Sequence, residues 1–154
     1  MTRFNALRLF AIGFSVFAVG GALAQPVISG SYYEEFSNRQ CTSTNTCEIV
    51  FTKIQQNILI TDVACSFTSS QPLTGGYMAV SDTGIAGNGA GTRRQTFFPI
   101  NYSTTDRGSI YSRSLFQTKF LFGATRWPSI VVESPLTNTT ILTQCKIVGT
   151  IQPN

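Results

Sequence analysis

The chain has 154 residues, a formal net charge of +4 and no histidine. Its length suits a single domain with a buried core. Without histidine, Ser-His-Asp and Cys-His nucleophilic systems and imidazole metal sites are excluded. No serine has a lysine three positions later, as a Ser-Lys hydrolase would require.

Residues 1–24 have the pattern of a secretory signal peptide. Two arginines precede an apolar run of 16 residues from Leu9 to Ala24, which ends in Ala22-Leu23-Ala24. A helix needs roughly 20 apolar residues to span a bilayer, so the run is too short for a retained anchor. We expect cleavage after Ala24, which leaves one exported domain, 25–154, without a membrane span. That domain would be secreted or periplasmic, and a bacterial source is favoured.

After residue 24, apolar residues recur mostly with period two and are separated by Gly, Pro, Asn and Ser clusters, a pattern typical of short β-strands. The glycine-rich segment 82–94 reads as a long loop. Turn signals about every ten residues indicate an antiparallel β-sandwich. The pattern does not distinguish a jelly-roll topology from an immunoglobulin-like one. The predicted strands are Val27–Phe36, Glu48–Ile54, Asn57–Ser69, Gly76–Ser81, Gln95–Tyr102, Ser109–Phe116, Lys119–Phe122, Ser129–Glu133 and Thr139–Ile151.

The four cysteines are predicted to form two disulfides, because export brings them into oxidising surroundings. Cys145 falls on the apolar face of the last predicted strand, and Cys65 on that of Asn57–Ser69. We therefore pair Cys65 with Cys145 and Cys41 with Cys47, which makes the sandwich disulfide-braced. The residues predicted to share the apolar face of Asn57–Ser69 are Leu59, Thr61, Val63, Cys65 and Phe67.

The stretch QCTSTNTCEI, residues 40–49, places five residues between Cys41 and Cys47. Structural zinc sites typically pair cysteines two to four residues apart and need two further ligands. Redox pairs of the thioredoxin type have two intervening residues and a βαβ context. The spacing therefore favours a structural staple, lying just ahead of the strand predicted to begin at Glu48.

Charge is distributed unevenly along the exported part. Residues 25–92 contain five acids and two bases, whereas residues 93–126 contain six bases and a single acid, Asp106. The basic section suggests a face that meets anions, with solvated surface as the alternative. Its candidate ligand contacts are Arg93 and Arg94, directly after the glycine-rich loop, and Arg126.

Aromatic side chains give the strongest lead to a ligand. Tyrosine and tryptophan rings can stack on a sugar while their polar groups stay in water. Trp127, in GATRWPS, is predicted at a loop or strand edge beside Arg126, and packing in the core or at its rim is the alternative role. The other amphipathic rings are Tyr32, Tyr33, Tyr77, Tyr102 and Tyr111.

Motifs for cofactors are missing from the sequence. Gly87-Asn88-Gly89-Ala90-Gly91 matches neither the dinucleotide fingerprint nor the nucleotide-phosphate loop. Asp82 stands without the repeated acids of a calcium loop. We therefore expect no cofactor and no metal, and we expect no nucleic acid partner because the chain is exported with a small net charge.

The main hypothesis is an exported, non-enzymatic β-sandwich that acts by binding or surface interaction, with glycans or other anionic ligands or surfaces as partners. A carboxylate-based glycan hydrolase or lyase is the first alternative, and it predicts two acids within about 10 Å in a cleft. A purely structural cell-surface subunit is the second, and it predicts a large apolar patch or a free strand edge. The oligomeric state stays open.

In size, signal peptide and disulfide-braced sandwich, the chain resembles the exported subunits of bacterial surface fibres. The resemblance implies assembly on a cell surface. The chain departs from that family at its end, because Ile151-Gln152-Pro153-Asn154 has no aromatic residue in the second position from the C-terminus.

Overall fold

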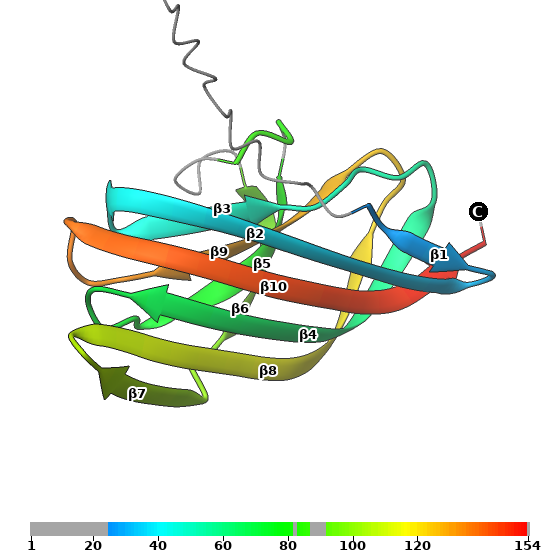
Figure 1. The fold of residues 1–154 in the computed structure, drawn as a ribbon. Coiled ribbons are helices and arrows are strands. Elements are labelled where there is room, and N and C mark those ends of the chain that lie inside the picture. The colour runs from blue at the N-terminus through cyan, green and yellow to red at the C-terminus, as the bar shows by residue number, and fades with distance from the viewer. Residues whose placement is uncertain (1–24, 82, 87–91, 154) are drawn as a thin grey trace, which may run out of the picture.

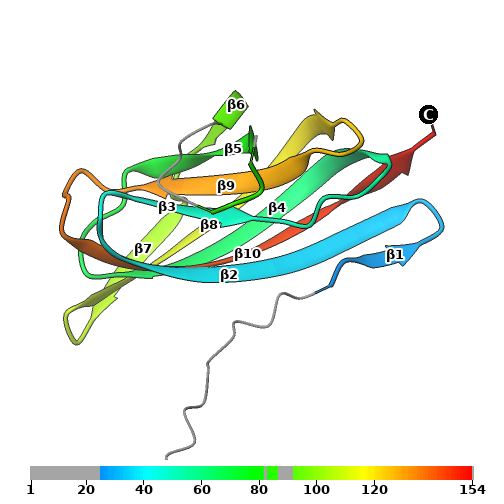
Figure 2. The same ribbon diagram turned by 90° about the horizontal axis from the view of Figure 1, so that it is seen from above.

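A computed structural model describes residues 25–81, 83–86 and 92–153, and at 92–95 it describes the backbone alone. The predicted signal peptide, 1–24, lies outside the described residues. The described chain forms ten strands in two antiparallel sheets packed face to face (Figures 1 and 2), which confirms the predicted β-sandwich. The strands are β1 (Val27–Ser29), β2 (Tyr32–Thr44), β3 (Thr46–Val50), β4 (Asn57–Ser69), β5 (Gly75–Ser81), β6 (Thr92–Phe98), β7 (Tyr102–Asp106), β8 (Ser109–Phe122), β9 (Trp127–Glu133) and β10 (Thr139–Gln152).

The order of the strands identifies the topology. The six-stranded sheet has the order β1-β2-β10-β4-β8-β7, and the four-stranded sheet has the order β3-β9-β5-β6. The pairs β5·β6, β4·β8, β3·β9 and β2·β10 nest inside one another, as in one long hairpin. The further pairs β10·β4 and β5·β9 close this hairpin into a roll. This is the jelly-roll arrangement, so the immunoglobulin-like alternative is wrong.

The core lies between the two sheets and is built by alternating side chains. On β10, every second residue from Ile141 to Ile147 points inward and is buried, while the residues between them face outward. On β4, the register shifts between Ile60 and Asp62, so the inward series runs through Ile58 and Ile60 and resumes at Val63. The prediction that Leu59 and Thr61 share the face of Val63 is therefore wrong, because a bulge changes the alternation.

Several strand boundaries differ from the predicted ones. The predicted first strand is broken by a turn at Gly30, which has a φ of +59°, and β2 then continues to Thr44. Its polar residues 37–40 pair with β10 along their whole length, and this pairing keeps them in a strand. β8 is one strand across the predicted gap at Gln117-Thr118, because its pairing with β4 continues past the gap.

Two further boundaries differ, at β3 and at β6. β3 ends at Val50 instead of Ile54, because the Thr52 N–H donates to the Glu35 carboxylate on β2 rather than to a neighbouring strand. β6 begins at Thr92, inside the segment predicted as loop, because residues 92–98 pair with β5.

Both predicted disulfides are present, and they have different roles. Cys65 and Cys145 lie directly opposite each other on β4 and β10, with their Cα atoms 4.2 Å apart, so this bond joins neighbouring strands of one sheet. Cys41 lies on β2 and Cys47 on β3, which belong to different sheets, so this bond joins the sheets where the chain crosses at Asn45. The prediction of a staple ahead of a strand is corrected, because both of its cysteines lie within strands.

The disulfides should contribute unequally to stability. The cysteines of Cys65–Cys145 are separated by 80 positions in the sequence, and those of Cys41–Cys47 by 6 positions. The chain-entropy estimate is about 4.5 kcal/mol for the longer loop and about 2.4 kcal/mol for the shorter. We expect the double variant Cys65→Ala/Cys145→Ala to unfold at lower urea concentration than Cys41→Ala/Cys47→Ala. Urea titrations followed by tyrosine fluorescence test this, and the reverse order would contradict it.

Candidate ligand-binding site

The outward face of the six-stranded sheet presents polar and aromatic side chains. On β8, Ser112 and Ser114 point into the sandwich and are buried, whereas Tyr111, Arg113 and Leu115 point outward and are exposed. The same alternation holds on β4 and β10. Because successive residues of a strand face opposite sides, the residues that build the core leave their neighbours free for other contacts.

Strand register aligns these outward residues in rows across the sheet. Gln144 of β10 is opposite Ser66 of β4, Ser66 is opposite Arg113 of β8, and Arg113 is opposite Tyr102 of β7. In the next row, Thr68, Tyr111 and Thr104 lie opposite one another on β4, β8 and β7. Adjacent rows are about 7 Å apart, and adjacent strands about 4.8 Å.

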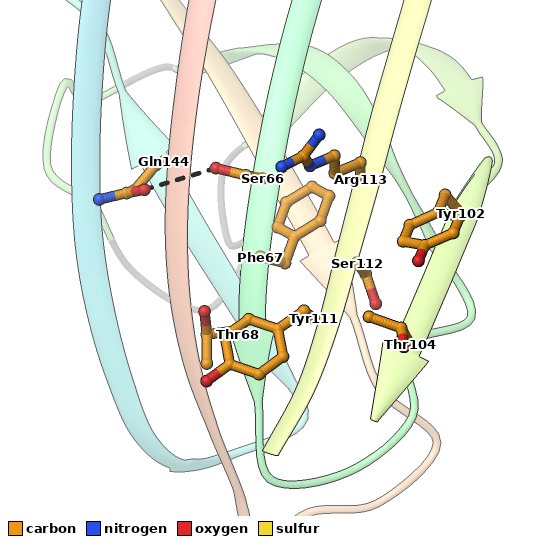
Figure 3. A pocket seen from close by; sticks show the side chains of 9 residues that line it. All are labelled: Ser66, Phe67, Thr68, Tyr102, Thr104, Tyr111, Ser112, Arg113 and Gln144. Carbon is orange, nitrogen blue, oxygen red and sulfur yellow. Dashed lines mark hydrogen bonds between the residues drawn. The ribbon is translucent and has the colours of Figure 1, made fainter. Parts of the chain in front are cut away.

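These two rows form a pocket of about 690 Å³, which we call the tyrosine pocket (Figure 3). Tyr102 is 58% exposed and Tyr111 43% exposed, so both rings are accessible to a ligand. The Ser66 hydroxyl donates to the Gln144 amide oxygen at 3.4 Å. The residues that line the pocket are Ser66, Phe67, Thr68, Tyr102, Thr104, Tyr111, Ser112, Arg113 and Gln144.

β7, which carries one wall of the pocket, is held against β8 at both ends. At its start, the Asn101 side-chain oxygen accepts from the Leu115 N–H at 2.9 Å, and the Asn101 N–H donates to the Arg113 carbonyl at 2.9 Å. At its end, Arg107 and Gly108 have φ angles of 48° and 81°, which suit a tight two-residue hairpin turn. The wall is therefore part of a paired strand rather than a loop.

The residues lining the pocket offer groups for binding. The two phenol rings offer apolar faces, and the guanidinium, amide and hydroxyl groups offer hydrogen bonds in several directions. No Asp or Glu is among these lining residues. In the described part of the chain, no group of three or more His, Cys, Asp or Glu side chains could hold a metal ion.

Trp127, predicted as a ligand contact, lies elsewhere, as the half-buried first residue of β9 on the four-stranded sheet. The Lys53 Nζ lies 4.4 Å from the ring centroid. Gly84 approaches the indole so closely that a Cβ there would lie 2.3 Å from Cε2. A pocket of about 510 Å³ adjoins the ring. The contacts with Lys53 and Gly84 are packing contacts, and the role of Trp127 as a ligand contact stays a prediction.

Arg126 is not among the residues that line the tyrosine pocket, and the strand of Arg93 and Arg94 belongs to the other sheet. Arg126 is exposed in the turn before Trp127, where its N–H donates to the Gly123 carbonyl at 3.3 Å. Arg93 and Arg94 lie on β6, and the register places the Arg93 backbone two strands away from Pro128. The side chains of Arg93 and Arg94 lie outside the described residues, so their predicted role stays a prediction.

Arg113, Gln144 and the pair Tyr102 and Tyr111 were not predicted from the sequence to form a site. Both tyrosines were recognised as amphipathic rings, but they lie on different strands and meet only through the β7–β8 register. One available signal was the spacing of Tyr111 and Arg113, which places both on one face of a predicted strand. The contribution of Gln144 depends on the pairing of β10 with β4, which local sequence does not reveal.

A second polar cluster joins the buried Tyr33 and Glu35 to the exposed Thr52. The Tyr33 hydroxyl donates to the Glu35 carboxylate at 2.5 Å, and the Thr52 hydroxyl donates to it at 2.8 Å. Together with the Thr52 N–H, these bonds satisfy a carboxylate that is only 4% exposed. Burial, and then the bond to Glu35, raise the pKa of Tyr33 well above its usual range. The cluster ties β2 to the segment that follows β3.

Comparisons with protein-family models, curated proteins and solved structures found no match for this chain. Among the described residues there is also no helix with the length and apolarity needed to cross a membrane.

Gly84→Ala tests the packing of the 83–86 segment on Trp127. Gly84 has a φ of +67°, and its added methyl group would collide with the indole. We expect a loss of about 1–3 kcal/mol in unfolding free energy. Gly123→Ala is the control, because a Cβ there would have Asn57 Oδ1 at 4.0 Å as its nearest neighbour. Equal stability of both variants in thermal unfolding would show that Gly84 does not pack as described.

Tyr33→Phe tests the buried cluster through pH. At neutral pH we expect a loss of about 1.5–3 kcal/mol, the range for a hydrogen bond to a charged group. Because the pKa of Tyr33 is raised in the folded state, its stabilisation is complete below about pH 10 and falls as the unfolded tyrosine ionises above it. Urea titrations on both sides of that pH should show the wild type losing more stability than the variant. A constant difference would contradict the raised pKa.

Proposed function

We propose that this protein is an exported, non-enzymatic binding protein that holds a glycan on the outward face of its six-stranded sheet. The observation that carries the proposal is the tyrosine pocket, which is lined by two exposed phenol rings, a guanidinium and an amide from β7, β8 and β10 of one sheet. A sugar ring presents both apolar C–H faces and hydroxyl groups, and this set of side chains offers a partner for each.

The way the site is built supports binding. Ligand sites combine apolar and aromatic surface with a few placed polar groups. Tyrosine supplies a large contact area with only two side-chain torsions to immobilise, so little conformational entropy is lost on binding. Because the strands that carry these residues are paired, the spacing between the rings is largely set before a ligand arrives.

The proposed location is secreted or periplasmic. Two disulfides are compatible with an oxidising compartment. The signal peptide predicted at residues 1–24 would direct export to that compartment, and we propose a bacterial source.

A carboxylate-based hydrolase is the alternative that one observation favours. Glu34 and Asp62 face outward on β2 and β4, each opposite Val148 of the strand between them, so they lie about 10 Å apart. However, hydrogen bonding from Tyr32, and next the charge of Lys146, lower the pKa of Glu34. A general acid needs a raised pKa, so binding is the stronger proposal. Sugar release from bound glycans that Glu34→Gln abolishes would establish the hydrolase instead.

Substitution of the pocket tyrosines tests the proposal. Tyr102→Ala and Tyr111→Ala should each weaken glycan binding about threefold to tenfold, since an aromatic ring contact contributes roughly 0.5–1.5 kcal/mol beyond its buried area. Isothermal titration calorimetry with ligands selected on a glycan array measures the change.

Two other variants locate the site. Phe97→Ala is the control, because Phe97 is 71% exposed on the four-stranded sheet and should not affect binding. If Arg126→Ala weakens binding while the tyrosine variants do not, the site lies at the predicted Arg126 and Trp127 contacts. Absence of binding to every glycan would overturn the proposal.

A further inference from the structure

The centre of the tyrosine pocket has an uncompensated positive charge. Arg113 lies between Ser66 on one side and Tyr102 on the other, and neither neighbour has a carboxylate. The ion pair that the structure shows among the described residues joins Lys146 to Glu34, so Arg113 has no carboxylate partner there.

The nearest acids on this face are too far away to neutralise Arg113. Asp106 is opposite Ser109, four residues along β8 from Arg113. Asp62 is four residues along β4 from Ser66. Both separations correspond to about 13 Å of strand, which exceeds the Debye length of about 8 Å at physiological ionic strength. An anionic group arriving at Arg113 would therefore meet attraction with little opposing repulsion.

We infer that the ligand is an acidic glycan, a sugar chain that carries carboxylate groups, and that Arg113 binds one of these carboxylates while Tyr102 and Tyr111 pack against the sugar rings. This inference rests on the proposed function and specifies its substrate class. A guanidinium presents a planar fork of N–H donors that matches the two oxygens of a carboxylate. Ser66 and Gln144, in the same row, are placed to bond hydroxyl groups beside it.

The surroundings of the pocket favour a chain over a single acidic sugar. The pocket opens onto a sheet face whose next row contains the exposed Leu115 and Lys146. Lys146 is two strands and one row from Arg113, about 12 Å away. Its pair with Glu34 is exposed and spans 3.6 Å, and such surface pairs are worth little. A second carboxylate on the same chain could therefore replace Glu34 as its partner.

Matched ligands test the inference by calorimetry on the mature protein. The probes are short oligogalacturonates, oligoalginates and hyaluronan oligosaccharides, each beside its methyl-esterified form, which has the same sugars without the charge. We expect at least one acid to bind about tenfold or more tightly than its ester, a preference that weakens as salt is added. Arg113→Gln should remove the preference, so that this variant binds the acid and the ester about equally, and Arg113→Lys should retain part of the preference.

The control variant is Lys119→Gln, which removes an exposed charge from the same strand six residues away. It should leave the preference intact, and an effect equal to that of Arg113→Gln would overturn the role of Arg113.

Equal binding of acid and ester, with both weakened by Tyr111→Ala, would overturn the inference and leave the proposed function standing. Binding of none of these glycans, or of any neutral one, would overturn both. Tighter binding of sulfated chains would overturn the carboxylate assignment, and tighter binding of single-stranded DNA would overturn the glycan class.

Discussion

The register between β4 and β10, fixed covalently at Cys65 and Cys145, is the constraint on which the rest of the structure depends. These strands lie side by side within the six-stranded sheet, and all its outer strands are positioned relative to them. Because side chains alternate between faces, a slip of one residue would turn the core residues of the slipped strand outward. The disulfide therefore constrains the core and, through the same alternation, the row that runs from Gln144 to Tyr102.

The two sheets are joined along one side by two contacts of different chemistry. Cys41–Cys47 joins them at the crossover from β2 to β3, and the Tyr33–Glu35–Thr52 cluster joins β2 to the chain just after β3. Glu35 shows how polar groups are accommodated in this interior. Its carboxylate is surrounded by donors from Tyr33 and Thr52, and this compensates for its removal from water. β3 ends where it does because the Thr52 N–H is engaged by that carboxylate.

The fold class and the cysteine pairing could be predicted from the sequence because both depend on local patterns. Period-two alternation indicated most strands, and the positions of Cys65 and Cys145 on apolar faces indicated their pairing. The extent of β2 could not be predicted, because residues 37–40 are polar and become a strand only by pairing with β10. The bulge after Ile60 was equally hidden, since it depends on the β8 partner strand. The choice between jelly roll and immunoglobulin-like topology depends on which strands are neighbours, and strand lengths and turns do not encode this.

The candidate site was harder to predict than the fold for a related reason. Trp127 and Arg126 were predicted as contacts because the chain has a single tryptophan and a basic section ends beside it. In the structure, the indole of Trp127 packs against Gly84 and Lys53. The tyrosine pocket combines common residues from four strands, and Ser66 and Gln144 are 78 positions apart in the chain. Only tertiary pairing shows that they belong together.

The outward residues of the tyrosine pocket take no part in the core, and this has a consequence for how the protein can diversify. Thr68, Thr104 and Gln144 can be exchanged without disturbing the buried side chains, because those lie on the alternate positions of the same strands. Under the proposed function, the residues for recognition and those for folding are thus interleaved and nearly separate sets. Such a sheet could serve as a scaffold for libraries in which specificity is varied by directed evolution while the backbone stays constant.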